Sequence, residues 1–489
     1  MSNARAELRL QDPSLFREDA WLASGWTASA EDRRFDVMDP ANGRLLAAVA
    51  SLTAEQVDEA IAHAALAQRD WQQLTAKQRA GHLQRWFNEI MAHIDDIATI
   101  LTAEQGKPMQ EARGEVLYAA SFIEWFAEEG KRAYGDIIPA PQNDKRIAVL
   151  KQPVGVCAAI TPWNFPAAMI TRKVAPALAA GCSILVKPAE QTPLTALALA
   201  VLAERAGIPA GVLQIVTGDA REIGAVLTAS ETVRKLSFTG STEVGRLLSA
   251  QCAPTIKRLS LELGGNAPFI VFDDADIDAA IEGAIVSKYR NSGQTCVCAN
   301  RFLVQDGIYD EFVARLADSA AALKVGAGTD EGTEQGPLID VAALENVQSL
   351  IRDATDKGAH LVVGGRPHQL GRTFFEPTVL RDVDTSMRMA REEIFGPVAP
   401  VFRFSTEAEA VALANDTEYG LAAYLYTRDG ARAWRVGEAL EYGMVGLNTG
   451  LISNEVAPFG GVKQSGLGRE GSRYGLDEYL ELKYLCMQV

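Results

Sequence analysis

Residues 154–187, VGVCAAITPWNFPAAMITRKVAPALAAGCSILVK, decide the fold that we expect for this chain. An apolar run at 154–160 is followed by an alanine-rich, helix-length segment at 167–180 and by a second apolar run at 183–187. Short apolar runs that alternate with helix-length segments are typical of parallel strands joined by crossover helices. This stretch therefore predicts a parallel sheet covered by helices.

The same alternation continues along the chain in two series. In the first, a helical segment at 193–206 is followed by apolar runs at 213–217, 235–238 and 257–261. In the second, the runs fall at 268–272, 301–304, 360–363, 398–404 and 444–447. Because 489 residues are too many for one ordinary core, we expect an α/β protein whose packed domains leave a cleft between them, a usual place for a site.

Three segments lie outside these two series. Residues 53–56, TAEQ, form a capping box that predicts the start of a helix, and helical patterns continue to about residue 132. Residues 146–151 alternate like a strand, and residues 476–486 alternate again near the C-terminus. We expect strands within 133–150 to meet this C-terminal strand.

The composition argues against several classes of protein. The formal net charge is −16 and no long basic run is present, so nucleic acid and anionic membranes are not expected partners. No apolar run reaches the roughly 18 residues of a membrane span, and residues 1–8 lack the apolar core of a signal peptide. Six cysteines scattered over so long a chain do not suggest a disulfide framework. We therefore expect a cytoplasmic protein.

The segment 288–298, KYRNSGQTCVC, presents Cys296 as a candidate nucleophile. Cys296 follows a polar, glycine-containing turn in which a substrate could reach a thiol. The alternative is a small buried hydrophobic residue, the usual role of a lone cysteine. No second Cys-x-Cys pair and no histidine lies near Cys296 and Cys298, so we expect no metal site.

Glu262, in LELGG (261–265), is the candidate base for this thiol. A thiol that attacks a carbonyl carbon needs a base nearby and a donor for the resulting oxyanion. The alternative for Glu262 is an ion pair with Lys257 or Arg258. The two glycines that follow would permit close approach of a ligand or of another segment.

Asn164, in TPWNFP (161–166), is the candidate oxyanion donor. Its alternative is to cap the helix that begins near Phe165. A cap and an oxyanion donor both require a fixed amide in a loop, so the two interpretations do not exclude each other.

Two further motifs suggest a nucleotide. Residues 238–245, FTGSTEVG, join a predicted strand to a predicted helix and leave backbone N–H groups at the helix start, which suits phosphate. Lys187 and Glu190 lie at the end of another strand, where α/β sheets bind nucleotides, although the pair could also be an ordinary surface ion pair. No histidine lies near any of these motifs, which argues against a Cys–His hydrolase.

Together these residues resemble the aldehyde dehydrogenase superfamily over nearly the whole chain. Seven motifs in family order carry the resemblance: PWNFP (162–166), KPAE (187–190), FTGS (238–241), LELGG (261–265), GQTC (293–296), EEIFGP (392–397) and PFGG (458–461). The resemblance implies an α/β fold with two Rossmann-like doubly wound domains and a small β oligomerisation element. The NAD-binding domain would comprise residues 1–132 and 151–261, the catalytic domain 262–460, and the oligomerisation element 133–150 and 461–489.

The resemblance also implies the roles of single residues. Cys296 would be the nucleophile, Glu262 the general base, and Asn164 with the Cys296 backbone N–H the oxyanion hole. Lys187 and Glu190 would hold the adenosine ribose, Ser241 the pyrophosphate and Glu393 the nicotinamide ribose. The full set of implied cofactor-binding residues is Thr161, Pro162, Trp163, Lys187, Glu190, Gly240, Ser241, Leu263, Glu393 and Phe395.

Glu190 also bears on the choice of cofactor. A carboxylate accepts hydrogen bonds from ribose hydroxyls but repels a 2′-phosphate. Many bacterial relatives of the most similar subgroup have serine at this position, and this chain departs from them. We therefore predict that NAD is preferred over NADP.

Within the superfamily the chain most resembles the succinate-semialdehyde dehydrogenases, through MITRK (169–173), YRN (289–291), CVC (296–298) and GLISNEVA (450–457). Their substrate carries a carboxylate opposite its aldehyde, and arginine recognises carboxylates by paired hydrogen bonds. Arg172 and Arg290 would line one funnel, unless they are solvated charges on helix surfaces. The implied substrate-binding residues are Arg172, Arg290, Ser453 (or its neighbour Asn454), Phe165 and Phe459.

The predicted activity is the oxidation of succinate semialdehyde to succinate with NAD(P)+, through a thiohemiacetal and a thioester of Cys296. Glutarate semialdehyde or a broader range of aldehydes are the alternatives. A CoA-acylating enzyme typically lacks the glutamate that Glu262 supplies, and a non-enzymatic protein would have no reason to keep Cys296, Glu262 and Asn164 together. The resemblance implies a homodimer or homotetramer.

Cys298 resembles the partner of the nucleophile in a redox switch of this subgroup. On a strand, Cβ atoms two residues apart lie farther from each other than the roughly 3.8 Å of a relaxed disulfide. A bridge between Cys296 and Cys298 would therefore require a bent backbone.

Overall fold

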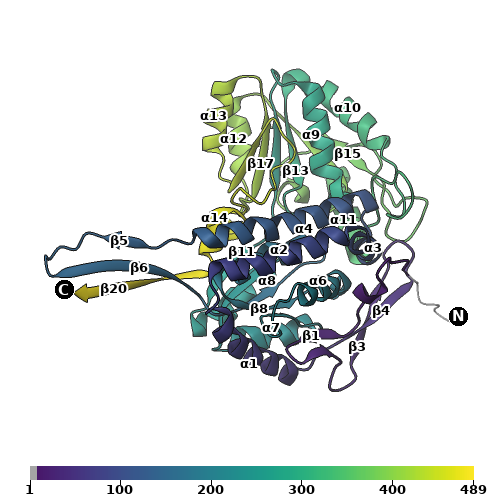
Figure 1. Cartoon of the computed structure of the whole chain (residues 1–489). Coiled ribbons are helices and arrows are strands. Elements are labelled where there is room, and N and C mark those ends of the chain that lie inside the picture. Colours follow the sequence, from purple (N-terminus) through teal and green to yellow (C-terminus); the bar gives the residue numbers. More distant parts are fainter. Residues whose placement is uncertain (1–7) are drawn as a thin grey trace.

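The computed structural model describes residues 8–489 and places the first series of apolar runs in an eight-stranded sheet (Figure 1). Strands β11, β10, β7, β8 and β9 are parallel, and antiparallel strands lie at both edges. The predicted run 183–187 coincides with β8. The order is β19 (Gly466–Leu467), β11 (Arg258–Glu262), β10 (Val233–Thr239), β7 (Val156–Ile160), β8 (Ser183–Lys187), β9 (Leu213–Ile215), β1 (Ala20–Leu22) and β2 (Gly25–Thr27).

Helices cover both faces of this sheet. Alternate residues of β7 divide between two cores: Cys157 and Ala159 face one, and Val156 and Ala158 face the other. The first face is covered by α2 (Ala76–Ala92), α3 (Ile94–Gln105), α4 (Met109–Glu129), α5 (Ala168–Ala180) and α6 (Pro193–Arg205). The second face is covered by α1 (Ala54–Trp71), α7 (Ala220–Ala229) and α8 (Thr242–Cys252). The predicted capping box at residues 53–56 is present at the start of α1.

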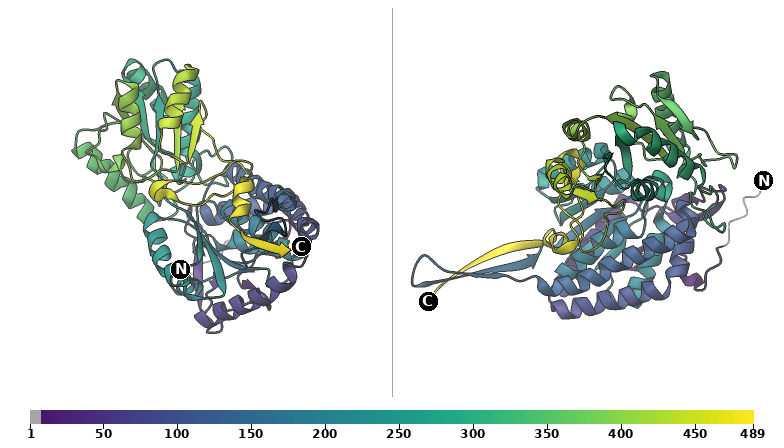
Figure 2. Two further views of the ribbon diagram at one scale, coloured as in Figure 1. Left: turned by 90° about the vertical axis from the view of Figure 1, so that its left-hand side faces the viewer. Right: turned by 90° about the horizontal axis from the view of Figure 1, so that it is seen from above.

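The second series of runs forms a seven-stranded sheet in a separate unit (Figure 2, left). All its strands are parallel except β14 at one edge. The order is β14 (His360–Val363), β15 (Thr378–Arg381), β16 (Val398–Phe404), β13 (Ala299–Gln305), β12 (Ala267–Val271), β17 (Ala422–Tyr426) and β18 (Met444–Leu447). Helices α9 (Ile277–Tyr289) and α10 (Tyr309–Ala321) cover one face, and α11 (Val341–Asp356), α12 (Glu407–Asn415) and α13 (Gly430–Ala439) cover the other. Two doubly wound sheets are therefore present, as predicted.

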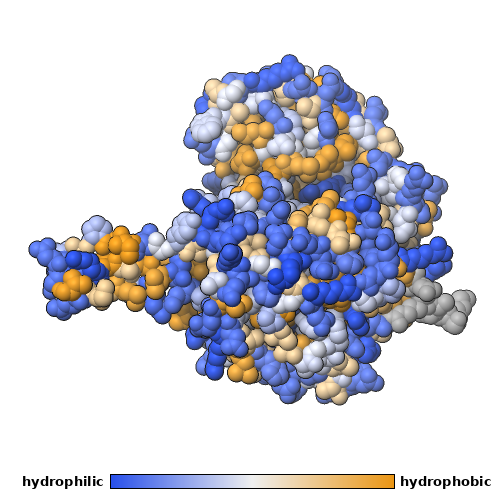
Figure 3. Space-filling model, viewed as in Figure 1, coloured by the Kyte–Doolittle hydropathy of each residue, from blue (hydrophilic) through white to orange (hydrophobic). Residues whose placement is uncertain are grey.

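A three-stranded arm projects from the first unit (Figures 1 and 2). It consists of β20 (Leu480–Gln488), β6 (Lys145–Pro153) and β5 (Asp136–Ile138), with β6 in the centre. The predicted meeting of the C-terminal strand with strands from 133–150 is thus confirmed. Apolar side chains gather on the arm's surface (Figure 3), and the exposed ones are Tyr134, Ile137, Ile138, Leu150, Leu482, Tyr484, Leu485, Met487 and Val489.

The C-terminal region differs from the prediction in where its strand begins. Residues 472–477 form helix α14 (Ser472–Asp477), which packs against α4 and α5, and the strand starts only at Leu480. Strand β19 pairs with β11 in the first sheet. Of the segment 461–489, only β20 enters the arm.

The N-terminal region contains strands that the helical pattern does not predict. Besides β1 and β2, strands β3 (Arg34–Met38) and β4 (Leu45–Ala50) form a two-stranded ribbon. Residues 1–7 lie outside the described residues. They include the start of the predicted NAD-binding domain and most of the segment expected to lack a signal peptide. From residue 8 to the end, no helix is both long and apolar enough to cross a membrane.

Candidate active site

A cavity of about 250 Å³ lies where the two units meet. The first unit contributes the segment after β7, the β10–α8 junction and the end of β11, so these residues lie at the carboxyl ends of parallel strands, where α/β sheets bind ligands. The second unit contributes Cys296 and the loop before β16. The lining residues are Pro162, Trp163, Asn164, Met169, Thr239, Gly240, Ser241, Glu262, Leu263, Gly264, Cys296, Glu393 and Phe395. The structure thus brings Cys296, Glu262 and Asn164 together.

Cys296 follows a tight turn at the end of α9. Asn291 and Ser292 in this turn both have left-handed backbone (φ 52° and 57°), a conformation that non-glycine residues keep only where the surroundings enforce it. Asn291 is held by Gln105, whose Nε2 donates to Asn291 Oδ1 (2.9 Å). Cys296 is half-buried and its thiol is free. The turn therefore presents the sulfur to the cavity from a constrained backbone.

The surroundings of Cys296 favour its protonated form. Burial raises the pKa of the thiol to about 12, the Glu393 and Glu262 carboxylates add to the rise, and the Arg172 guanidinium opposes it. Because the thiolate is the reactive form of a cysteine, a nucleophilic role for Cys296 would require removal of this proton.

Asn164 is fixed by contacts on both its side chain and its backbone. Its Nδ2 donates to the Gln294 carbonyl (3.1 Å), and among residues 8–489 no acceptor is found for the second N–H of the amide. Its backbone carbonyl accepts from Lys107 Nζ (2.8 Å) and from Asn291 Nδ2 (3.0 Å). The helix-cap alternative is wrong, because α5 begins at Ala168 and Glu115, not Asn164, accepts from its first N–H groups.

Glu262 is the last residue of β11 and is 3% exposed. Neither of its carboxylate oxygens has a hydrogen-bond partner among residues 8–489. The ion-pair alternative is wrong: Lys257 donates to the Ser230 carbonyl, and Arg258 pairs with Glu481 (3.4 Å). Burial, with the nearby Glu470 carboxylate, raises the pKa of Glu262 well above its ordinary value. An unpartnered buried carboxyl is costly, which points to a use in chemistry.

Gly264 and Gly265 allow two other segments to approach the end of β11. A Cβ at Gly264 would lie 3.0 Å from Glu393 Oε2, and a Cβ at Gly265 would collide with the Cys296 carbonyl. The Gly265 N–H donates to Glu393 Oε1 (3.2 Å). The segments that approach the two glycines closely, as predicted, are therefore those that contain Cys296 and Glu393.

Most of the predicted cofactor residues line the cavity or adjoin it. Pro162, Trp163, Gly240, Ser241, Leu263, Glu393 and Phe395 are lining residues. The Trp163 and Phe395 rings meet edge to face at 5.5 Å. The Thr161 N–H donates to the Lys187 carbonyl (3.0 Å), so these two residues lie side by side at the strand ends.

Lys187 and Glu190 form an ion pair with an Nζ–Oε2 distance of 2.8 Å. Lys187 is buried and Glu190 is part-exposed, so the pair is not simply an ion pair on the surface. Glu190 Oε1 also accepts from the Ala220 N–H at the start of α7 (2.8 Å). At the neighbouring helix, Ser241 caps α8 by accepting from the Val244 N–H (3.3 Å).

The two predicted substrate arginines each contact a predicted substrate phenylalanine. Arg172 lies over the Phe459 ring at 4.0 Å, and Arg290 lies over the Phe165 ring at 5.5 Å. The surface-charge alternative is wrong for Arg172, which is 1% exposed, whereas Arg290 is half-buried.

Arg172 is already paired on one side. Its Nε lies 2.7 Å from Glu470 Oε2, and its Nη1 lies 3.7 Å from the sulfur of Met169, which lines the cavity. Its Nη2 is buried and has no acceptor in the part of the chain that the structure describes. One terminal nitrogen of the Arg172 guanidinium is therefore left without an acceptor among the described residues.

Ser453 is not among the residues that line the cavity. A neighbouring groove of about 410 Å³ is lined by its neighbours Ile452 and Asn454 and by Phe459, and again not by Ser453. Asn454 Oδ1 accepts from the Ala457 N–H (2.8 Å), which shapes the loop.

Cys298 lies in a turn, so the expected strand geometry between Cys296 and Cys298 is wrong. Its N–H donates to the Thr295 carbonyl (2.9 Å), which closes a four-residue turn. Its buried thiol donates to the Lys288 carbonyl (3.2 Å), and both thiols are free.

Sequence reasoning missed Glu470 and the buried Lys107–Glu115 ion pair beneath Asn164. Glu470 pairs with both Arg172 and Lys173, and the Lys107 and Glu115 side chains pair at 2.5 Å. Nothing local marks Glu470, since its partners lie almost three hundred residues earlier (470 − 173 = 297). The family motifs could not identify it either, because residue 470 lies outside all seven.

The geometry agrees with the comparisons with known proteins. The model of the "Aldehyde dehydrogenase family" matches residues 26–485. The chain belongs to the aldehyde dehydrogenase family. The predicted family is therefore confirmed, and the protein is an oxidoreductase.

Similar proteins align with nearly the whole chain. A glutarate-semialdehyde dehydrogenase of Pseudomonas aeruginosa is 60% identical over 98% of this chain and 99% of the relative. A succinate-semialdehyde dehydrogenase of Escherichia coli (strain K12), whose name specifies NADP(+), is also 60% identical, over 98% of this chain and 100% of the relative. A crystal structure of succinate-semialdehyde dehydrogenase from Burkholderia pseudomallei is 63% identical with a TM-score of 0.98, over 98% of this chain and all of that one.

We expect the activity of the enzyme to rise with pH. Burial raises the pKa of both Cys296 and Glu262, so the deprotonated forms that the expected nucleophile and base require become more populated as pH rises. Thiolate increases about tenfold per pH unit below its pKa. Measured kcat/KM for an aldehyde should therefore climb from neutral to alkaline pH. The Cys298→Ser variant, a control for the second thiol, should show the same rise of kcat/KM with pH. A kcat/KM that does not change with pH would contradict the assignment of the rise to Cys296 and Glu262.

Proposed function

We propose that this enzyme oxidises succinate semialdehyde to succinate with NAD(P)+ as hydride acceptor. The observation that carries the proposal is the unsatisfied, buried Nη2 of Arg172 behind Met169, a cation beside the cavity that contains Cys296. A guanidinium in this state suits a carboxylate at the far end of a short aldehyde. The names of the Escherichia coli and Burkholderia pseudomallei relatives support the same substrate.

The residues present fit a dinucleotide. Thr161 Oγ1 and Thr239 Oγ1 are buried at the strand ends without hydrogen-bond partners among the described residues. Gly240 and Ser241 place the start of α8 at the cavity, where backbone N–H groups suit a pyrophosphate. Lys187 with Glu190 would hold the adenosine ribose, and Glu393 the nicotinamide ribose. When bound, the nicotinamide supplies an acceptor for hydride.

The residues around the cavity divide the remaining chemistry. Glu262, with both oxygens free, takes the proton of the Cys296 thiol, and the thiolate adds to the aldehyde carbon. The oxyanion of this thiohemiacetal accepts from the free N–H of Asn164 and from the Cys296 backbone N–H. Loss of the C–H electron pair as hydride leaves a thioester on Cys296. Glu262 releases the thiol proton to bulk water and then removes a proton from the water molecule that attacks the thioester. The C–S bond breaks, the carboxylic acid leaves, and the sulfur takes the proton back from Glu262, which restores the thiol.

The length of the substrate chain is the main alternative within this proposal. The Pseudomonas aeruginosa relative is named for glutarate semialdehyde and is as similar as the Escherichia coli relative. A CoA-acylating reaction is disfavoured by Glu262, which can activate water. All six cysteines are free thiols, which supports work in the reducing cytoplasm.

We expect Arg290→Ala to raise KM for succinate semialdehyde far more than KM for butanal. The loss of a charged hydrogen bond costs about 1.5–3 kcal/mol, or roughly 10- to 100-fold. Arg172→Ala should show the same selectivity together with a general loss of rate, because it also releases Glu470. The control is Arg315→Ala, at a surface ion pair on α10. Steady-state kinetics that show the same rise in KM for succinate semialdehyde and for butanal would contradict the proposal that these arginines bind the substrate carboxylate.

We also propose that NAD is preferred over NADP. The Glu190 carboxylate is held by Lys187 and by the N–H of Ala220, so a 2′-phosphate on the adenosine ribose would meet a fixed negative charge. Glu190→Ser should raise kcat/KM for NADP relative to NAD by about tenfold or more, the equivalent of roughly 1.4 kcal/mol. Equal efficiency of the unaltered enzyme with both cofactors would contradict the preference.

We further propose a homodimer or homotetramer assembled through the arm. Strands β20 and β5 are unpaired edges, and exposed apolar side chains such as Leu482 (70% exposed) lie along β20. Such edges and patches favour association. Sedimentation velocity should show an oligomer that Leu482→Lys weakens and Leu66→Lys, at an exposed leucine of α1, does not. A monomeric unaltered enzyme would refute this assembly.

A further inference from the structure

Asn300, the second residue of β13, binds the backbone on both sides of Glu393. Its Nδ2 donates to the Glu392 carbonyl (3.1 Å), and its Oδ1 accepts from the Ile394 N–H (2.9 Å). Asn300 is 3% exposed and does not line the cavity. One buried amide therefore fixes the residues that flank the Glu393 carboxylate.

The loop that carries Glu393 is irregular and is held by side-chain contacts, among them the Arg391–Asp416 ion pair and the Trp163–Phe395 ring contact. Residues 391–397 follow a short 3-10 helix (Arg388–Ala390) and have no regular secondary structure before β16. Phe395 in this loop has left-handed backbone (φ 51°). Apart from the Gly265 N–H, no hydrogen bond to the Glu393 side chain is found among residues 8–489. The position of that carboxylate therefore depends on how the loop is held.

Asn266 connects Asn300 to the same loop from a second side. Asn300 Nδ2 also donates to Asn266 Oδ1 (2.6 Å), and Asn266 Nδ2 donates to the Ala390 carbonyl (3.0 Å). Asn266 follows Gly265, whose N–H contacts Glu393. The two asparagines thus tie the loop to the segment between β11 and β12.

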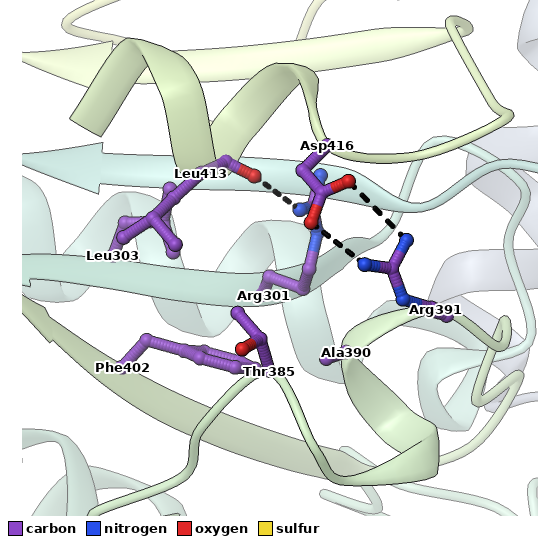
Figure 4. Close-up of a pocket in the computed structure, with 8 residues that line it drawn as sticks. All are labelled: Arg301, Leu303, Thr385, Ala390, Arg391, Phe402, Leu413 and Asp416. Carbon is purple, nitrogen blue, oxygen red and sulfur yellow. Dashed lines mark hydrogen bonds and ion pairs between the residues drawn. The ribbon is translucent and has the colours of Figure 1, made fainter. Parts of the chain in front are cut away.

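Arg301 anchors Asn266 from the interior of the second unit. Its guanidinium donates to the Asn266 carbonyl (3.2 and 3.1 Å), to the Leu413 carbonyl (2.7 Å) and to the Ala414 carbonyl (2.8 Å). Figure 4 shows Arg301 reaching Leu413 while Asp416 pairs with Arg391 instead. The adjoining cavity of about 10 Å³ is too small for a ligand, so this arginine acts as a support.

We propose that Asn300 is a positioning residue that holds Glu393 in place for the nicotinamide ribose. The inference rests on the proposed cofactor role of Glu393 and adds the residue on which that role depends. Asn300 does not line the cavity and would act through the loop 391–397. Its loss leaves Glu393 mobile, so the nucleotide binds less tightly while the Cys296 end of the cavity is unchanged.

The test compares Asn300→Ala with Gln305→Ala, at the other end of β13. Gln305 is a matched control because its amide also accepts from one backbone N–H (Asp273) and donates to one backbone carbonyl (Ser405), far along the strand from the cavity. Asn300→Ala should raise the Kd for NAD, measured by calorimetry, and the KM for NAD by about tenfold, as the loss of its two hydrogen bonds to the loop 391–397 implies. The KM for the aldehyde should change less than about twofold, since no aldehyde contact is lost. Gln305→Ala should change neither.

A double variant and hydrogen exchange separate positioning from a general loss of structure. If Asn300 acts through Glu393, Asn300→Ala should add nothing to the nucleotide defect of Glu393→Ala. Amide exchange in residues 388–397 should quicken in Asn300→Ala and not in Gln305→Ala. Asn300→Asp, which keeps the acceptor for Ile394, serves the same measurements if the alanine variant does not fold.

The measurements test the positioning role of Asn300 and the cofactor role of Glu393 separately. Full additivity of the two substitutions, or unchanged exchange in residues 388–397, overturns the positioning role of Asn300. A normal Kd for NAD in Glu393→Ala, with quickened exchange in Asn300→Ala, overturns the proposed function of Glu393 while Asn300 still holds the loop.

Discussion

The burial of the Glu262 carboxyl group without a hydrogen-bond partner is the main constraint on the structure of the cavity. A carboxyl group 3% exposed and unpartnered opposes folding, because it leaves water and finds no donor within the described chain. The fold tolerates it because Glu262 ends a parallel strand in a large, well-packed sheet. The same burial keeps the proton affinity of Glu262 high, which suits its proposed role as a base for the thiol and for water. Stability and chemistry are thus opposed at this residue.

The neighbouring groups are held by contacts that cross between the two units. Asn291 hydrogen-bonds Gln105 from α3 and the Asn164 carbonyl, so the turn before Cys296 is fixed by the first unit. Gly264 and Gly265 admit Glu393 and the Cys296 backbone against the end of β11. The cavity therefore lies at the junction of the two units, and a shift of one unit against the other would separate Cys296 from Glu262 and Asn164.

Much of the fold could be predicted because its signals are local. Strand β8 has the predicted bounds 183–187, and the capping box at 53–56 starts α1. Periodicity and capping depend on residues only a few positions apart. The helix α14 and the pairing of β19 with β11 were missed, because short segments take their structure from distant partners that no local pattern reveals.

The site could be predicted only in part, for the same reason. The family motifs named Cys296, Glu262 and Asn164, which the structure brings into one cavity. They did not name Glu470, which pairs with Arg172, or Asn300, which binds the loop around Glu393. The turn at Cys298 was also missed, since a Cys-x-Cys spacing does not specify whether the backbone is extended or bent. Support residues act through burial and long-range contacts, and these become visible only in three dimensions.

The most direct measurement is peptide mass spectrometry of the Glu262→Gln enzyme, quenched after mixing with succinate semialdehyde and NAD. Without this base, both attack by the thiol and hydrolysis should slow. Because solvent can also accept the thiol proton, the thioester should still form slowly and then accumulate, since no base activates water to remove it. We predict an acyl group on the peptide that contains Cys296, removed by hydroxylamine and missing when NAD is omitted. NADH formation with no adduct on Cys296, or with the adduct on another residue, would contradict the account.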